Sequence, residues 1–131
     1  MNSREAGFAL PGALLALLLL SVALALVAAS LQLRMRLVLR ESRSLTLTAL
    51  SDAALAEALA HLSEDRSFRG SPAHAFGGGR LESEVHPFSD IQFMIRATAF
   101  YAGRERTVEA DVVRPPDQTA RVVRWRLVAE E

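Results

Sequence analysis

The residues of this sequence that could take part in chemistry are three histidines and a few carboxylates, all beyond residue 60. The histidines are His61, His74 and His86. Each lacks further metal ligands at a useful spacing, and His74 lies in a stretch that indicates a solvated loop. Glu82, Glu84 and Asp90 could bind a hard cation, but no EF-hand-like spacing accompanies them, so a solvated strand face is favoured. The sequence therefore predicts no metal site.

The constellations that mark enzymes are also missing from the sequence. It has no cysteine, no HExxH pair and no serine with a base in a recognisable pattern. The glycines from Gly77 to Gly79 precede a predicted strand, whereas a phosphate-binding loop requires a helix there. We therefore expect no enzyme activity, no cofactor and no small-molecule substrate.

Charge and length limit the possible partners and the size of the core. The 131 residues have a formal net charge of zero, so no global field attracts nucleic acid or acidic lipid. A nucleic-acid surface built on Arg121, Arg124 and Arg126 is disfavoured, because Trp125 between them is expected to face the core. Only one small domain fits outside the N-terminal stretch, and its core would be marginal without burial against a helix.

The element that dominates the chain is the stretch from Ala6 to Leu33, which has no charged residue and contains eleven leucines. About 20 apolar residues span a ~30 Å hydrocarbon core. Inside lipid the backbone must satisfy its own hydrogen bonds, so a helix is the expected form. The stretch therefore predicts a single membrane-spanning helix.

A short charged leader precedes this stretch, ending in Gly7 and followed at once by Phe8 and the apolar run. At these residues the sequence resembles the type IV pilin superfamily, which includes pilins, minor pilins and the pseudopilins of type II secretion. By motif and helix pattern the resemblance covers Gly7 to about Leu62. It implies that a prepilin peptidase cuts after Gly7 on the cytoplasmic side and that the new N-terminal Phe8 is methylated.

The resemblance also implies a location, partners and a type of subunit. The precursor would be a single-pass protein of the bacterial inner membrane with a periplasmic C-terminal domain. It would then join other pilin or pseudopilin subunits in an envelope-spanning or extracellular filament. The family usually has a glutamate four residues after the Phe, where this sequence has Gly12. Some minor pilins and the K-type minor pseudopilins similarly lack it, which implies a subunit that lies at the tip or initiates assembly.

Pro11, next to Gly12, lies near the new N-terminus, where its missing N–H costs nothing, so the helix can begin there. Two other interpretations of the N-terminal stretch remain open. A secretory signal would be cut at Ala23-Leu24-Ala25, although the apolar stretch exceeds the usual 7–15-residue signal core. A single-span anchor for an exported binding module explains the hydrophobicity but not the Gly-Phe pair.

Four arginines follow the apolar stretch: Arg34, Arg36, Arg40 and Arg43. Positive-inside counting would place the C-terminal part in the cytoplasm, opposite to the family orientation. We keep the family orientation, because long domains can translocate regardless of charge and cleavage after Gly7 needs a cytoplasmic leader. The arginines are expected to lie among lipid headgroups or against acidic residues of neighbouring subunits.

Further along, apolar residues recur at spacings of three and four, which places them on one face of a helix. They are Leu47, Leu50, Ala54, Ala58, Leu59 and Leu62. Ser51 and His61 are expected largely off this face. The helix should end at or slightly before Gly70, because Ser71 and Pro72 follow it.

Residues 71–79, with one proline and three glycines, predict an irregular loop, and beyond Arg80 apolar residues recur at every second position. Four strands are expected, and the central two have a defined register. Pairing residues whose numbers sum to 205 sets Ala97 opposite Val108 and Arg96 opposite Glu109, with the turn at Ala102-Gly103. In the last strand Val123, Trp125 and Leu127 should face the core, with Arg124 and Arg126 facing away.

The sequence thus predicts an α+β fold in which a long N-terminal hydrophobic helix packs on a small antiparallel sheet of about four strands, as in pilins. The expected organisation is a leader at 1–7, the membrane or filament-core half of the helix at 8–33, its amphipathic half at 34–70, a loop at 71–79 and the sheet at 80–131. The expected function is that of a minor pilin-like or pseudopilin-like structural subunit. The alternative is a single-span membrane-anchored binding module.

Overall fold

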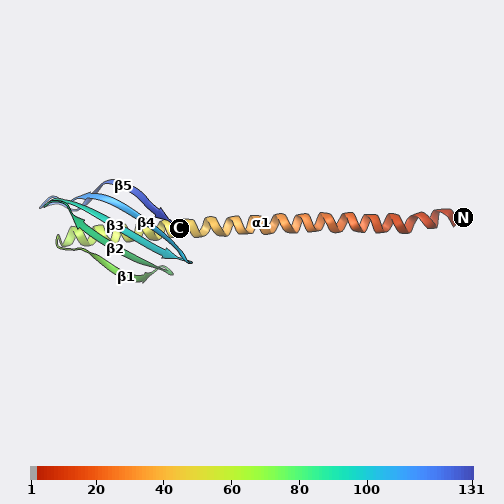
Figure 1. Ribbon diagram of the computed structural model, residues 1–131, viewed down its shortest axis with the longest axis horizontal. Coiled ribbons are helices and arrows are strands. Elements are labelled where there is room, and N and C mark those ends of the chain that lie inside the picture. Colours follow the sequence, from red (N-terminus) through yellow and green to blue (C-terminus); the bar gives the residue numbers. More distant parts are fainter. Residues whose placement is uncertain (1–2) are drawn as a thin grey trace. The chain divides into compact units, whose positions relative to one another are not determined.

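The computed structural model describes residues 3–131, which form one helix and five strands (Figure 1). The elements are α1 (Ser3–Glu64), β1 (Gly70–Phe76), β2 (Gly79–Pro87), β3 (Gln92–Tyr101), β4 (Arg104–Val113) and β5 (Arg121–Glu130). The chain divides into two compact units, one extending to Glu41 and the other from Ser42 to Glu131. The α+β class is as predicted.

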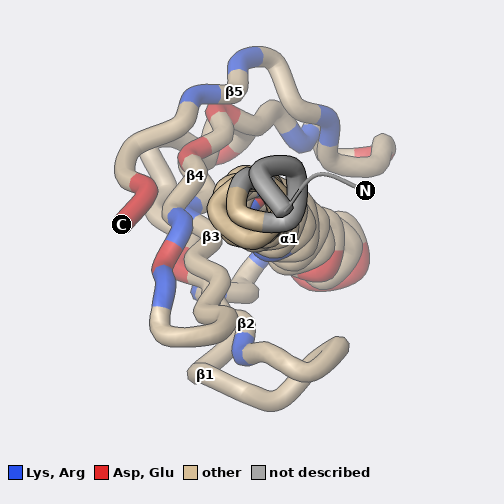
Figure 2. The backbone as a smooth tube through the Cα atoms, turned by 90° about the vertical axis from the view of Figure 1, so that its right-hand side faces the viewer, with Lys and Arg blue, Asp and Glu red and all other residues tan. Residues whose placement is uncertain are grey.

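In the second unit the five strands form one antiparallel sheet in chain order, and α1 from Ser42 onward covers one face of it (Figures 1 and 2). The apolar face predicted for the helix forms the helix side of the core. Five of its six members are at most 5% exposed: Leu47, Leu50, Ala54, Ala58 and Leu62. Leu59 is half-buried and packs against the same core. Ser51, expected off this face, is fully buried, because its hydroxyl donates to the Thr48 carbonyl at 2.8 Å and so needs no other partner.

The sheet side of the core comes from alternate residues of β2, β3 and β4, and the predicted register of the β3–β4 hairpin is confirmed. Ala97 lies opposite Val108, and Arg96 lies opposite Glu109. The turn residues Ala102 and Gly103 have φ values of 51° and 76°, as a two-residue hairpin turn with two positive φ angles requires. Because a shift by one residue would move every core side chain to the other face, burial of one face fixes this register.

The sheet has five strands and not four, because residues 70–76 form β1 where a loop was predicted. Gly77 and Gly78, with φ values of 54° and 81°, make a two-residue hairpin turn from β1 into β2. Pro72 fits because β1 is an edge strand, and an irregularity between Ser71 and His74 removes it from the regular ladder. The consecutive glycines thus mark a hairpin turn between two strands and not an irregular loop.

The helix boundaries also differ from the prediction. At the C-terminal end α1 stops at Glu64, well before Gly70, because the Asp65 carboxylate accepts hydrogen bonds from the backbone N–H and hydroxyl of Ser67 at 2.8 and 2.6 Å. This local turn competes with further helix. At the N-terminal end the helix of the uncut chain extends to Ser3, so Pro11 lies inside it, whereas the predicted start at Pro11 concerns the chain cut after Gly7.

Trp125 and Leu127 of β5 lie on the predicted side of the sheet, but the prediction that they are part of the core is wrong, because neither is buried. Trp125 is 46% exposed and Leu127 45% exposed. They do lie on the helix-facing side of the sheet, since Trp125 pairs with buried Ala110 and Leu127 with buried Val108. A helix about 10–12 Å across cannot cover five strands spaced about 4.8 Å apart, so it covers the middle of the sheet and leaves β5 bare.

Candidate functional site

The first unit presents an apolar helical surface that the described residues of that unit leave uncovered. Every side chain from Ala9 to Glu41 is exposed, and Leu18 and Leu24, for example, are 61% and 62% exposed. Exposing one such leucine to water costs about 1.5–3 kcal/mol relative to burying it. Within residues 3–131, α1 is the one helix long and apolar enough to cross a membrane.

The predicted processing and assembly residues lie at the start of this helix. Gly7 and Gly12 have open surroundings, because a Cβ added to either would meet no atom within 4 Å beyond its chain neighbours and the adjacent helical backbone. Pro11 has no N–H, so the Gly7 carbonyl lacks its usual helical donor. The Phe8 side chain and leader residues Met1 and Asn2 lie outside the part that the structure describes. The helix is continuous through the predicted boundary at residue 7.

The four predicted arginines are all exposed on α1, but they do not share one face. Arg36 and Arg40 are four residues apart and therefore adjacent on one side of the helix. Arg34 lies two residues from Arg36 and projects from nearly the opposite side. Arg43 belongs to the start of the second unit. None of the four has a carboxylate within 4.0 Å among the residues that the structure describes.

On the sheet face away from the helix, Glu109 of β4 is held between arginines of both neighbouring strands. Its side chain is only 7% exposed. Oε1 accepts from Nε and Nη2 of Arg96 at 3.1 and 2.7 Å, and Oε2 accepts from Nε of Arg126 at 2.8 Å and from its Nη2. The hydrogen bonds from Arg96, followed by those from Arg126, lower the pKa of Glu109. The network ties β3, β4 and β5 together.

The three histidines are far from forming a ligand set and have separate structural contacts. His61 stacks on Phe68, with ring centroids 5.0 Å apart. His86 lies 3.4 Å from a carboxylate oxygen of Glu84. His74 was expected in a solvated loop, but it lies on β1, where its Nε2 is 3.1 Å from a Glu57 carboxylate oxygen of α1. That contact joins an edge strand to the helix.

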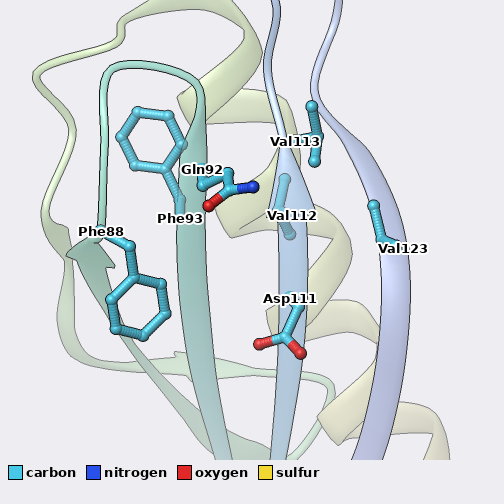
Figure 3. Close-up of a pocket in the computed structure, with 7 residues that line it drawn as sticks. All are labelled: Phe88, Gln92, Phe93, Asp111, Val112, Val113 and Val123. Atoms are coloured by element: carbon cyan, nitrogen blue, oxygen red, sulfur yellow. The ribbon is translucent and has the colours of Figure 1, made fainter.

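A shallow pocket of about 300 Å³ lies on the outer face of the sheet, near the loop that joins β2 to β3 (Figure 3). Phe88 and Val123 supply apolar surface, and Gln92 and Asp111 supply the polar groups. One amide and one carboxylate provide neither a nucleophile with its base nor a metal-ligand set. Within residues 3–131, no group of three or more His, Asp or Glu side chains could hold a metal ion.

The apolar residues whose burial the sequence overestimated lie on β5. Beside Trp125 and Leu127, Val123 is 64% and Val128 49% exposed. One signal could have revealed this exposure. Valine follows valine at 122–123, and valine follows Leu127, whereas a strand with one face buried alternates apolar with polar residues. Both consecutive pairs coincide with register shifts in the β4–β5 pairing.

No protein-family model matches this chain, and no curated protein and no solved structure is significantly similar to it.

Proposed function

We propose that this chain is a minor pilin-like or pseudopilin-like structural subunit of a type IV pilus or type II secretion filament. It is made as an inner-membrane precursor with its C-terminal domain in the periplasm, and a prepilin peptidase then cuts it after Gly7. The observation that carries the proposal is the exposed apolar surface of α1 up to Glu41, joined to a small α+β unit with a core of its own. Such a helix must be covered by lipid or by other helices.

The Gly7-Phe8 pair supports a filament subunit over a plain anchor. In a plain anchor the residues at the membrane edge have no required identity, whereas the resemblance to pilins gives Gly7 a role before the cut and Phe8 a role as the new N-terminal residue. The Arg residues from Arg34 to Arg43 would then contact lipid headgroups in the precursor and acidic residues of neighbouring subunits in the filament.

Gly12 supports a place at the tip or in initiation. An unpaired charge near the bilayer centre costs on the order of 2.5–3.5 kcal/mol, so each N-terminal amine within a filament needs a partner carboxylate from a neighbour. A subunit with Gly12 cannot supply that carboxylate to a subunit ahead of it. Its own Phe8 amine can still be neutralised by the subunit that follows. The tip has no subunit ahead of it, and there the missing carboxylate costs nothing.

Processing is tested by co-expressing the full chain with a prepilin peptidase and determining the mature N-terminus by mass spectrometry. We expect the product to start at Phe8 and Gly7→Leu to abolish cleavage. Gly12→Leu is the matched control, because the substitution is the same and an added Cβ at either glycine meets open space in the described structure. A start near Leu26 would indicate a secretory signal. An uncut chain would favour the anchored binding module.

The position in the filament is tested by counting copies in purified filaments. We expect rare, tip-restricted wild-type subunits and a Gly12→Glu variant that enters the shaft. Gly12→Gln, which has the same shape without the charge, should behave as wild type. Abundant wild-type subunits along the shaft would refute the tip position and leave the filament function standing.

The anchored binding module is the second candidate function, and the bare surface of β5 favours it. Exposed apolar side chains at the edge of a sheet mark a place where another chain can bind.

A further inference from the structure

The two edges of the sheet differ in how they are protected against pairing with another chain. The β1 edge is seven residues long, contains Pro72 and has an irregular register. The β5 edge is ten residues long and has neither proline nor glycine. It is last in the strand order, so its outer N–H and C=O groups are available for a further strand. Between its two register shifts, Arg124 to Leu127 pair regularly with β4.

The two faces of β5 differ in chemistry. On the helix-facing side, Trp125 and Leu127 are nearly half exposed and form an apolar shelf beside the covered core. On the outer side, Arg124 pairs in register with Asp111, and Arg126 pairs with Glu109. An additional strand at this edge would therefore meet apolar groups on one side and arginines on the other, because side chains alternate between faces along a strand.

The arginines of β5 are unequally neutralised. Arg126 is bound by Glu109. Arg121 and Arg124 are exposed, and neither has a carboxylate within 4.0 Å in the part of the chain that the structure describes. Figure 2 shows these basic positions spread along β5. The outer side of this edge thus carries two positive charges that carboxylates of a partner could neutralise.

We propose that β5 is the docking edge for an extended segment of a partner protein, which adds a sixth strand in which apolar residues alternate with acidic ones. The apolar residues cover Trp125 and Leu127, a carboxylate pairs with Arg124, and the backbone bonds to the free edge over the regular stretch from Arg124 to Leu127. Arg121 lies beyond the register shift and adds positive charge on the same outer side. This inference concerns the second unit alone and holds whether or not the chain enters a filament.

The alternation also decides against single-stranded nucleic acid as the occupant. Nucleic acid binds by stacking bases on an aromatic ring while nearby cations contact its phosphates. Here Trp125 lies on the helix-facing side, and Arg124 lies on the outer side of the same strand. A base stacked on Trp125 would carry its phosphate away from the arginines. A strand in which apolar and acidic residues alternate can contact Trp125 on one face and the arginines on the other at the same time.

The test uses the full chain in detergent micelles and the fluorescence of Trp125, which is the sole tryptophan. The probe is a capped synthetic peptide of alternating valine and glutamate, and its controls are the valine–lysine peptide and a valine–glutamate peptide with a central proline. We expect saturable binding of the first peptide, with a blue shift of Trp125 emission and less quenching by acrylamide. Neither control peptide should cause these changes.

Two charge reversals locate the site. Arg124→Glu should weaken binding of the acidic peptide about tenfold, since it removes one ion pair and adds a repulsion. Arg80→Glu is the matched control, because Arg80 is an exposed arginine on β2 and the charge change is the same. It should leave the affinity unchanged. Circular dichroism of both variants checks that the sheet remains folded.

Several results would overturn the proposal. One is equal binding of the acidic and basic peptides, and another is acidic-peptide binding that Arg124→Glu leaves intact. No Trp125 response at millimolar peptide would also refute it. A blue shift caused by a single-stranded oligonucleotide and abolished by Arg124→Glu would assign the edge to nucleic acid. A blue shift that grows with protein concentration alone would assign it to a second copy of the chain.

Discussion

Removing the charge of Glu109 should cost the second unit a large share of its stability. Glu109→Gln keeps the shape of the side chain but replaces one carboxylate oxygen with an NH₂ group. That group would face the guanidinium of either Arg96 or Arg126, so donors would oppose donors where the wild type has hydrogen bonds. The other arginine would retain a neutral acceptor in place of a charged one.

The expected cost follows from the exposure of the three side chains. Removing one partner of a fully buried ion pair costs about 3–5 kcal/mol. Here Glu109 is 7% exposed, but the arginines are 44% and 54% exposed and water can solvate them after the substitution. We therefore assign about 1 kcal/mol to each arginine and expect a loss of about 2 kcal/mol. For a domain of this size that lowers the Tm by about 8–16 °C.

The assay is thermal and denaturant unfolding of the full chain in detergent micelles, followed by the Trp125 signal and by circular dichroism. Glu82→Gln on β2 is the control, since Glu82 has no ion pair in the described structure, and it should change stability by less than about 0.5 kcal/mol. A double-mutant cycle of Glu109→Gln with Arg126→Met should give a coupling of about 1 kcal/mol.

The pH dependence gives a second check on Glu109. Its pKa in the folded state lies below the ordinary value of 4.5, so its stabilising contribution is present above pH 4.5 and is lost as the pH falls through the lowered pKa. The difference between wild type and Glu109→Gln should shrink in the same direction. A loss smaller than about 0.5 kcal/mol at pH 7, or a difference that persists in strong acid, would refute the reasoning.

Two further predictions concern the attachment of β1. The hydrogen bonds of His74 to the Pro72 carbonyl and then to Glu57 raise the pKa of His74, so their stabilising contribution is present below pH 6.5 and is lost as the pH rises through the higher folded-state pKa. The amide protection factors of β1, which are exchange rates corrected for the intrinsic pH dependence of exchange, should fall over that range, and His74→Gln should abolish this fall. Gly70 has a φ of 125°, and an added Cβ would lie 2.1 Å from a backbone carbonyl oxygen of β2. Gly70→Ala should therefore lower the free energy of unfolding by about 3 kcal/mol, whereas Gly78→Ala, in an open turn, should lower it by about 1–2 kcal/mol. Equal losses for the two substitutions would contradict this account.

The chain's local patterns determined much of the fold. The helical spacing from Leu47 to Leu62 identified the buried face of the helix, because residues at i, i+3 and i+4 lie on one side of a helix. The register of β3 and β4 followed from matching apolar and charged pairs at once, and the Ala102-Gly103 turn fixed the loop between them. The uncharged stretch before Arg34 identified a helix long enough to cross a membrane.

Only the tertiary structure decided which parts of the sheet are covered. Alternation along β5 shows that Trp125 lies on the helix-facing side, but coverage depends on the width of one helix compared with five strands. The extra strand β1 depends on the order of strands in the sheet in the same way. Pro72 is tolerated only in an edge strand, and the local sequence does not determine which strand lies at the edge. Alternation is a property of neighbouring residues in one strand. Burial also needs an element from elsewhere in the chain, and for β5 the described residues provide none.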